Sequence, residues 1–407
     1  MPKTIATTPS WYWPEGVSRV LGIPPVPVQA LAVDGPARRD ADATAAVWGD
    51  VVVSAGELGA QVHAVARALR HHNGSGPIMV AGGPSLPGAV AVLGAMASGR
   101  PTILVAPEAA SDAVRSAAST DDLVAVADDD GLAALRAAGI AAEAVDDLLA
   151  RAHDVAATPG NGAGEPSDAQ APAVRLGGRD GPVWHSHRSL LAGALAQQAF
   201  LAPAAGSPWL SMASPCTWDG LCNLLVARIS GSPLVLARPG PEAEEAATRH
   251  TPAWMSGTMD DAGGTWSGGR RRKRGGGGEG RYLLATVDGP FDPDERRSVG
   301  AAAGADVLTV FGQAETGPVL AAHPSWFLDE AVGVPVPNMH VLPADPDTGE
   351  PVDVLWELLD RAMVSVWSPS LAVEGIEPGP GLPAGRRYVT GVLAASDPNG
   401  MLYLVDE

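Results

Sequence analysis

Hydrophobic and polar positions along the first part of the chain follow two different periods. Residues 47–58 (VWGDVVVSAGEL) combine a short alternating pattern with a turn, which predicts a β-hairpin. Ser54 is placed to cap a following helix, in which Leu58, Val62 and Leu69 recur at intervals of three and four residues. This segment therefore predicts a hairpin that leads directly into an amphipathic helix.

The next segments alternate between buried strands and helices. Residues 77–83 (PIMVAGG) predict a buried strand, 86–99 a buried helix that ends at a glycine, and 101–107 (PTILVAP) a second strand. Two further rounds of strand and helix are predicted near 123–139 and 140–153. Strands that alternate with helices in this way indicate a parallel sheet.

The remainder of the chain changes character twice. Residues 158–171, rich in Gly, Pro, Ser and Asn, predict a surface loop, and 189–202 predict a helix. Residues 219–239 predict a helix, a glycine stop and a strand, whereas 263–280 are of low complexity. Strands and turns dominate after that, and no internal repeat is visible in the sequence.

Composition excludes several classes of protein. With 407 residues, 46% hydrophobic and 18% charged, the chain is predicted to form two or three α/β subdomains. A net charge of −19 argues against nucleic acid as a partner. No targeting segment is visible, and the longest apolar run, near 88–98, is short of the about 20 residues that span a bilayer. Two cysteines favour a reducing, cytoplasmic location.

Seven segments resemble, in order, the motifs of the adenylate-forming (AMP-binding) superfamily, which includes acyl-CoA synthetases and peptide-synthetase adenylation domains. They are 47–69, 86–107, 184–191 (WHSHRSLL), 214–239, 307–318 (VLTVFGQAETGP), 333–352 and 387–405 (RYVTGVLAASDPNGMLYLV). The resemblance implies two mostly parallel sheets with flanking helices and a small distorted β-barrel. It implies subdomains at 1–170, 171–320 and 321–407, ending at the family's hinge, without the C-terminal lid domain.

The resemblance also assigns a nucleotide site, which is eroded. The family's phosphate loop falls on Gly178, Arg179, Asp180 and Gly181, where the hydroxyl residues and the lysine are missing and a carboxylate is added. Arg179 is a candidate substitute for that lysine. Val392 replaces the aspartate that accepts the ribose hydroxyls. ATP or AMP with Mg²⁺ are therefore the implied cofactors, and their efficient use is not expected.

Other positions of that implied site are retained. Glu315 matches the Mg²⁺-binding glutamate, which makes it both the catalytic and the metal candidate, although a solvated turn residue remains an alternative. Phe311 matches the aromatic residue that packs on adenine, and Ala314 replaces the threonine that donates to the α-phosphate. The remaining cofactor-binding candidates are Gly289, Pro290, Gly312 and Gln313.

Asp219 matches the aspartate that pairs with the substrate's amino group in the amino-acid-activating branch. An equal alternative is a helix N-terminal aspartate stabilised by the macrodipole. Trp218, Cys222 and Asn223 are the other substrate-binding candidates, and Cys222 is expected to be a small core residue rather than a nucleophile. His185, with His187, belongs to a segment that positions the phosphate loop, so metal ligation there is not expected.

Three functions remain open. The first is a diverged acyl- or aminoacyl-activating enzyme, AMP-dependent synthetase/ligase-like, in secondary metabolism, with impaired ATP use. The second is a non-catalytic scaffold or pseudoenzyme, and the third is an ATP-independent acyl transferase acting on thioesters. The expected partners are a small carboxylic or amino acid or an acyl thioester, and an acyl or peptidyl carrier protein. A basic run could dock such a carrier, or could be a solvated loop: Arg270, Arg271, Arg272, Lys273 and Arg274.

Overall fold

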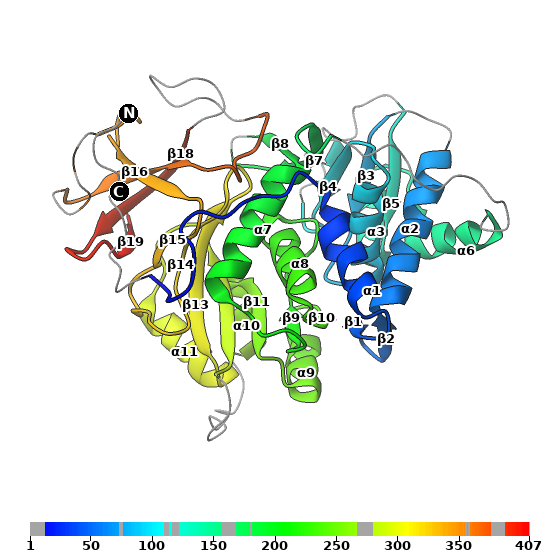
Figure 1. Cartoon of the computed structure of the whole chain (residues 1–407), viewed down its shortest axis with the longest axis horizontal. Helices are drawn as coiled ribbons and strands as arrows, with labels where there is room; N and C mark the ends of the chain where they lie inside the picture. The colour runs from blue at the N-terminus through cyan, green and yellow to red at the C-terminus, as the bar shows by residue number, and fades with distance from the viewer. Residues whose placement is uncertain are drawn as a thin grey trace.

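Helices pack on three β-sheets in this chain, and two of the sheets are mostly parallel, as predicted (Figure 1). The computed structural model describes residues 13–72, 76–109, 114–115, 122–155, 168–179, 181–266, 280–352, 354, 356, 359–375 and 387–406. The basic run at 270–274, Asp180 and most of the predicted loop at 158–171 lie outside these residues.

The first sheet has six strands and carries the eroded phosphate loop at its edge. All neighbouring strands in it are parallel except the last two, which form an antiparallel hairpin. Its order is β6 (Glu143–Ala144), β5 (Val124–Ala127), β3 (Ile78–Ala81), β4 (Thr102–Val105), β7 (Pro172–Gly177) and β8 (Pro182–Ser186).

The second sheet has nine strands, of which the six in the middle run parallel to one another. Antiparallel strands complete it at both edges. Its order is β15 (Val334–Pro335), β14 (Gly317–Ala321), β13 (Asp306–Gln313), β12 (Tyr282–Val287), β11 (Trp254–Thr258), β9 (Trp209–Ser211), β10 (Leu234–Leu236), β1 (Thr44–Trp48) and β2 (Val51–Ser54).

The third sheet is antiparallel and occupies the segment for which the resemblance implies a small barrel. Its order is β16 (His340–Ala344), β17 (Ala362–Trp367), β18 (Tyr388–Ser396) and β19 (Leu402–Val405). It is an open sheet among the described residues, and a bridge between Gly333 and Leu402 links it to the end of the nine-stranded sheet. Its strands approach the eroded loop from the side opposite the six-stranded sheet.

Local sequence explains where the principal helices begin and end. Ser54 caps the helix after it through a complete capping box with Glu57, as its position predicts. Thr217 caps α8 by accepting from Gly220 N, and Gly231 ends α8 in the left-handed conformation. The described helices are the π-helical turn η2 (Ala30–Asp34), α1 (Gly35–Arg39), α2 (Ala55–His71), α3 (Leu86–Ala97), α5 (Asp129–Ala137), α6 (Val145–Val155), α7 (His187–Leu201), α8 (Trp218–Ser230), α9 (Pro241–His250), α10 (Met259–Trp266) and α11 (Pro293–Ala303).

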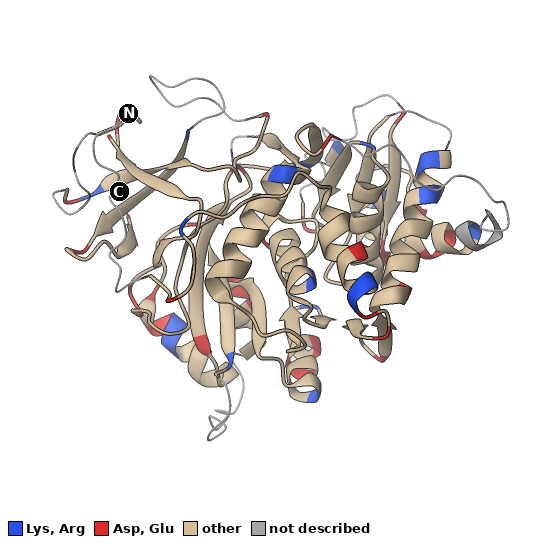
Figure 2. Cartoon of the chain, in the orientation of Figure 1, with Lys and Arg blue, Asp and Glu red and all other residues tan. Residues whose placement is uncertain are grey.

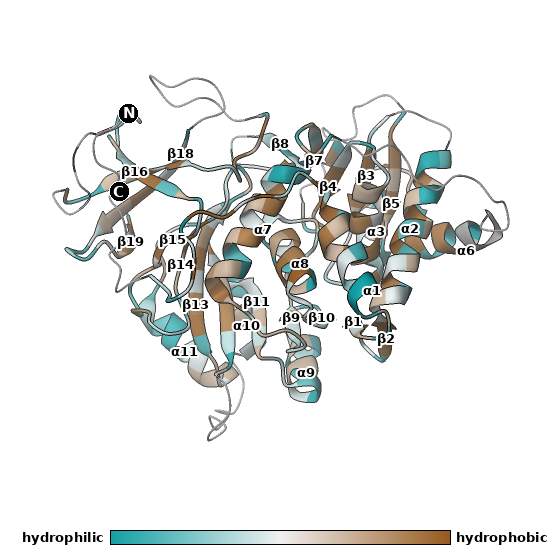
Figure 3. Cartoon of the chain, in the orientation of Figure 1, coloured by the Kyte–Doolittle hydropathy of each residue, from teal (hydrophilic) through white to brown (hydrophobic). Residues whose placement is uncertain are grey.

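One hydrophobic core extends across all three sheets. It includes the buried faces of α2, α3, α7 and α8, and a smaller cluster lies on the other face of the six-stranded sheet around Leu135. Figure 3 shows hydrophobic residues along α3 and α8 in the middle of the molecule and hydrophilic ones on α1 and α11. Charged residues gather on helix ends and loops (Figure 2). The helix that carries Asp219 is therefore a core element.

The sheets do not follow the boundaries predicted at residues 170 and 320. Strands β1 and β2, from the predicted first subdomain, pair into the nine-stranded sheet, because β1 lies parallel to β10. Strands β7 and β8, from the predicted second subdomain, pair into the six-stranded sheet. The three predicted subdomains stay a prediction, and the sheets alone divide the chain differently.

Candidate functional site

The eroded phosphate loop is the tip of the hairpin between β7 and β8. Gly178 N donates to Gly181 O at 2.9 Å, which closes the tip as a tight turn. Arg179 N donates to Glu315 Oε1 at 2.6 Å. Gly178 must be a glycine, because a Cβ there would lie 2.3 Å from that same carboxylate oxygen. The backbone N–H groups of Gly178 and Arg179 are thus already bonded to groups of the protein itself.

The side chain of Arg179 continues from the tip toward the four-stranded sheet. Its guanidinium donates to Thr390 O at 2.6 Å, and Gln313 Nε2 donates to the same oxygen at 3.1 Å. The guanidinium lies over Gly391, which has φ +69° and where a Cβ would lie 2.2 Å from Arg179 Nη1. Arg179 therefore joins the six-stranded sheet to both of the others.

Glu315 lies in the turn between β13 and β14, and hydrogen bonds from β8 and from the segment after β17 fix this turn. His185 Nε2 lies 2.5 Å from Ala314 O, so this nitrogen carries the proton, and Nδ1 lies 3.1 Å from Ser189 Oγ. Glu315 O accepts from Ala372 N at 2.8 Å. The Glu315 side chain is only 2% exposed, and its Oε2 has no hydrogen-bond partner within the described part of the chain.

The two histidines of the 184–191 segment are buried and neutral. Burial lowers the pKa of His185 to about 4, against which the bond to Ala314 O acts weakly, and burial lowers the pKa of His187 to about 4. The described residues contain no cluster of three or more His, Cys, Asp or Glu side chains that could hold a metal ion. His185 thus contacts the Ala314 carbonyl and His187 Nδ1 accepts from Val28 N at 3.4 Å, and a role in positioning the phosphate loop stays a prediction.

A cavity of about 860 Å³, here called the large cavity, opens beside these residues. Its wall includes most of the predicted cofactor-binding positions, namely Gly178, Arg179, Gly289, Pro290, Gly312, Gln313 and Glu315, together with Ala314, Val392 and Trp218. Phe311 is the exception, because its side chain is fully buried in the core and does not line the cavity. The structure therefore does not place Phe311 where it could stack on a base.

A second cavity of about 530 Å³, the small cavity, adjoins the large one. Gly177, Gly178 and Trp218 line both, and the Trp218 ring packs on Gly312, where a Cβ would lie 2.7 Å from the ring. The walls of the small cavity are mostly apolar and come from β4 and the segment after it. Its polar side chains are Arg175, Cys216, Thr217 and Asp219.

Asp219 lies in the first turn of α8 and is 6% exposed. Burial raises the pKa of this carboxyl above its usual range, while hydrogen bonds from Thr217 and from backbone amides act in the opposite direction. Its Oδ2 has no hydrogen-bond partner among the residues that the structure describes. A buried carboxylate oxygen without a partner is costly, so this position is poised for a donor.

The other two substrate-binding candidates point elsewhere. Cys222 Sγ donates to Gln197 Oε1 at 3.2 Å, and Asn223 Oδ1 accepts from Gln197 Nε2 at 3.0 Å. Neither residue lines the large or the small cavity. Burial raises the pKa of the Cys222 thiol far above its usual range, so Cys222 is the core residue that its sequence predicts. Gln197, in the middle of α7, had no signal in the sequence.

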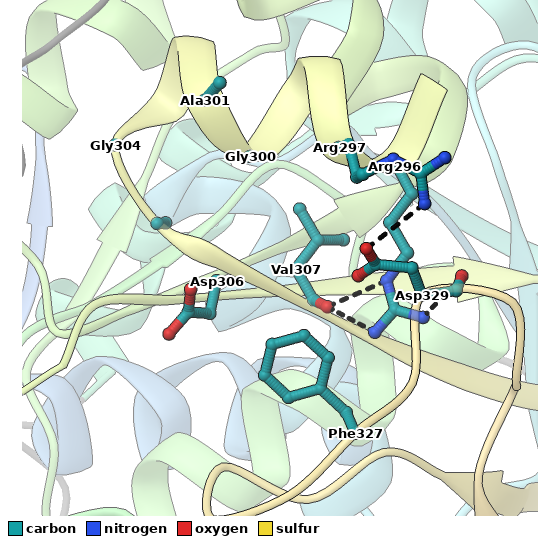
Figure 4. A pocket seen from close by; sticks show the side chains of 10 residues that line it. Arg296, Arg297, Gly300, Ala301, Gly304, Asp306, Val307, Phe327 and Asp329 are labelled. Carbon is teal, nitrogen blue, oxygen red and sulfur yellow. Dashed lines mark hydrogen bonds and ion pairs between the residues drawn. The ribbon is translucent and has the colours of Figure 1, made fainter. Parts of the chain in front are cut away.

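A third cavity, of about 480 Å³, lies between α11, β13 and the segment near 327–329 (Figure 4). Its most buried polar group is Arg296, which donates to the carbonyl oxygens of Val307, Leu328, Asp329 and Ala331. Arg297 pairs with acidic neighbours, including Asp329 at 3.2 Å. These arginines tie α11 to β13 and are satisfied by the protein, so this cavity is not a candidate site.

Comparisons with known structures identify the architecture. No protein-family model matches the chain, and no curated protein matches it in sequence. The structure is similar to VinN in complex with L-aspartate, with a TM-score of 0.77 and 18% identity, covering 96% of this chain and 100% of that chain. The chain has the adenylate-forming fold.

Two further solved structures share the adenylate-forming fold. One is FmoA3, a nonribosomal peptide synthetase, with a TM-score of 0.74, 18% identity, and coverage of 98% of this chain and 44% of that chain. The other is o-succinylbenzoate CoA synthetase (MenE) from Bacillus subtilis in complex with ATP and magnesium ion. Its TM-score is 0.75 and its identity 15%, covering 93% of this chain and 79% of that chain. Identities this low establish the fold alone.

The residues that this adenylate-forming fold brings to the large cavity do not fit a magnesium-bound triphosphate. At the hairpin tip, Gly178 N already donates to Gly181 O and Arg179 N to Glu315 Oε1. Val392 and Ala314 present apolar side chains to the cavity. Asp288, Asp347 and Asp406 add exposed carboxylates at its rim. An anion therefore meets acceptors and negative charge where it would need donors.

Sequence reasoning missed some residues of this site. Thr390 lies two residues before Val392 in a motif that the sequence does show. Its backbone oxygen accepts from Arg179 and Gln313, and a backbone contact of this kind leaves no signal in the sequence. Asp347, Arg361 and Asp406 come from loops of the four-stranded sheet, and Asp288 directly follows β12 of the nine-stranded sheet. Within the described ranges, no helix has both the length and the apolar character needed to cross a bilayer.

Proposed function

We propose that this protein is a diverged acyl- or aminoacyl-activating protein, AMP-dependent synthetase/ligase-like, that has kept a site for its organic ligand while its use of ATP is impaired. The bond from Arg179 N to Glu315 Oε1 carries this proposal. In this arrangement Glu315, the residue that matches the Mg²⁺ ligand, accepts the hydrogen bond that the loop would otherwise donate to a bound anion. A phosphate group would have to displace a buried carboxylate to gain the same donor.

Retention of ligand binding is supported by Asp219. Its carboxylate lies in the wall of an apolar cavity and keeps one oxygen without a partner among described residues. An ammonium group is the natural partner of such an oxygen. The proposed ligand is therefore an amine-bearing acyl compound or amino acid. A role in secondary metabolism is part of the proposal, supported by the likeness of fold to a nonribosomal peptide synthetase.

The alternatives have less support. An ATP-independent transferase that forms a thioester on cysteine would need a reactive thiolate, but burial raises the pKa of Cys216 to about 12. Cys222 is bonded to Gln197 away from both cavities. A scaffold or carrier-protein-binding role rests on the basic run at 270–274, which lies outside the described residues. Cavities lined by a carboxylate oxygen that has no partner among the described residues favour a small ligand.

Titration calorimetry with ATP and Mg²⁺ tests the proposal. We expect a dissociation constant weaker than about millimolar, because about four contacts are missing and each lost contact costs roughly 1–3 kcal/mol. Restoring two of them in a Val392→Asp, Ala314→Thr double variant should recover only part of the affinity, since Glu315 still occupies the loop. A wild-type dissociation constant in the micromolar range would show that the nucleotide site is intact and the proposal wrong.

A further inference from the structure

Three buried oxygens around the two cavities have no hydrogen-bond partner within the described residues: Asp219 Oδ2, Glu315 Oε2 and Gln313 Oε1. Their side chains are 6%, 2% and 8% exposed, respectively. All three atoms are acceptors, and all three side chains line a cavity. Burying such atoms without a donor is costly, so a ligand that donates hydrogen bonds is expected to lie between them.

The two cavities share Gly177, Gly178 and Trp218, here called the junction, with Glu315 and Gln313 in the wall of the large cavity and Asp219 in that of the small one. Gly178 lines both cavities, and Glu315 is directly against it, since a Cβ on Gly178 would lie 2.3 Å from Glu315 Oε1. Trp218 also lines both cavities, and Asp219 is its neighbour in the chain. The two carboxylates therefore each lie next to a residue that lines both cavities, Glu315 beside Gly178 and Asp219 beside Trp218.

The charges around the junction select a cation. Carboxylates line the two cavities at Asp219, Glu315, Asp288, Asp347 and Asp406, against the basic side chains Arg175, Arg179 and Arg361. Arg179 is occupied by Thr390 O, and Arg361 donates to Asp406 O. Within the described chain, no basic side chain forms an ion pair with Glu315 or Asp219.

We propose that the junction binds a ligand with two ammonium groups, of the aliphatic diamine class, with one group at Asp219 and the other at Glu315 and Gln313. The Trp218 ring and the apolar walls between the two groups contact the methylene chain. The Trp218 ring also attracts the nearby ammonium groups through its π-electrons. This inference rests on the proposed function, because it uses the same cavities and adds a second donor group to the amine-bearing ligand.

A metal ion fits the junction less well than an organic cation. The described residues gather no three metal-binding side chains, and Glu315 Oε1 is already bonded to Arg179 N. An ammonium group carries three donors and can satisfy Glu315 Oε2 and Gln313 Oε1 together. A ligand carboxylate placed at the same point would face Glu315 and would be repelled.

Titration calorimetry with 1,4-diaminobutane and with n-butylamine tests this proposal on the full chain. We expect the diamine to bind at least about tenfold more tightly than the monoamine, since only the diamine pairs with both carboxylates. Asp219→Asn and Glu315→Gln, which keep shape and remove charge, should each reduce diamine affinity by about tenfold or more. Asp42→Asn, an exposed carboxylate that lines neither cavity, is the matched control and should change it by less than about twofold.

Other outcomes would overturn the inference. Equal affinities for the two amines would show that there is no second ammonium site. If both amines lost affinity in Asp219→Asn alone, this inference would be wrong while the proposed function would stand. Competition between Mg²⁺ alone and the diamine, lost in Glu315→Gln, would identify a metal site instead. Thermal unfolding of each variant establishes that it is folded, and tight binding of ATP with Mg²⁺ would instead refute the proposed function.

Discussion

At the scale of single residues, the buried histidines His185 and His187 make the stability of the protein depend on pH. In the folded chain the pKa values of His185 and His187 are lowered to about 4 by burial, from an ordinary value of 6.5. The folded protein therefore binds fewer protons than the unfolded chain between these values. Stability from this source is complete above pH 6.5 and is lost as the pH falls toward 4.

We expect the free energy of unfolding to fall by up to about 3 kcal/mol for each histidine across this range. Denaturant titrations between about pH 7 and pH 4 measure it. His185→Gln keeps a donor for Ala314 O but does not titrate, so about half of the effect of this pair should disappear in that variant. An unchanged pH dependence in His185→Gln would show that His185 is not the titrating group.

The roles predicted for individual site residues stay predictions, but the structure shows which of these residues lie together. Glu315, Gln313 and Arg179 converge, as their motifs suggest, because a turn and a hairpin place them directly. Phe311 and Asn223 were predicted at the ligand and lie elsewhere. Which face of a strand or helix meets a cavity depends on its packing partners, such as Gln197, and the motif alone does not contain that information.

At the scale of elements, α8 depends on a glycine in its first turn. A Cβ on Gly220 would lie 1.8 Å from Ser214 O, a backbone atom that has little room to move. Gly264, in α10, offers the opposite case, because no atom of the described residues outside its own helix backbone and chain neighbours lies within 4 Å of a Cβ there. The two positions allow the same substitution to be compared in a crowded and in an open helix.

We expect Gly220→Ala to destabilise the protein by about 2 kcal/mol or more, because α8 must shift away from Ser214. Gly264→Ala should leave stability unchanged or raise it by about 0.5–1 kcal/mol, through helix propensity and a less flexible unfolded chain. Thermal unfolding of both variants measures the difference. Equal stabilities would mean that the loop at Ser214 yields easily and that α8 is not fixed by this contact.

Most helices and strands could be predicted from the sequence, because their periodicity and caps are local properties. The capping box at Ser54, the buried helix α3 and the glycine stop of α8 are examples. The pairing of β1 with β10 joins residues about 190 positions apart and leaves no trace in either segment. For the same reason the sheets could not be assigned to predicted subdomains from sequence alone.

At the scale of the whole molecule, the Arg179 side chain links the six-stranded sheet to the four-stranded sheet. Arg179→Ala removes its bond to Thr390 O and leaves the backbone bond to Glu315 in place. We expect faster amide exchange in β17 and β18, with a loss of about 1 kcal/mol in their protection. Arg238→Ala, which breaks a pair with Asp130 far from β18 in sequence, is the matched control. Unchanged exchange in β18 would show that other contacts hold the sheets together.

The occupation of the hairpin tip by Glu315 also restricts how this chain could change by mutation. A hydroxyl residue at Gly178 would collide with Glu315 Oε1, and any side chain at Gly391 would collide with Arg179. Removal of Glu315 alone would leave Arg179 N without its acceptor. Each of these single changes is therefore unfavourable unless its contact partner changes with it. The contacts among Gly178, Glu315, Arg179 and Gly391 are therefore expected to be kept or lost together, and not one substitution at a time.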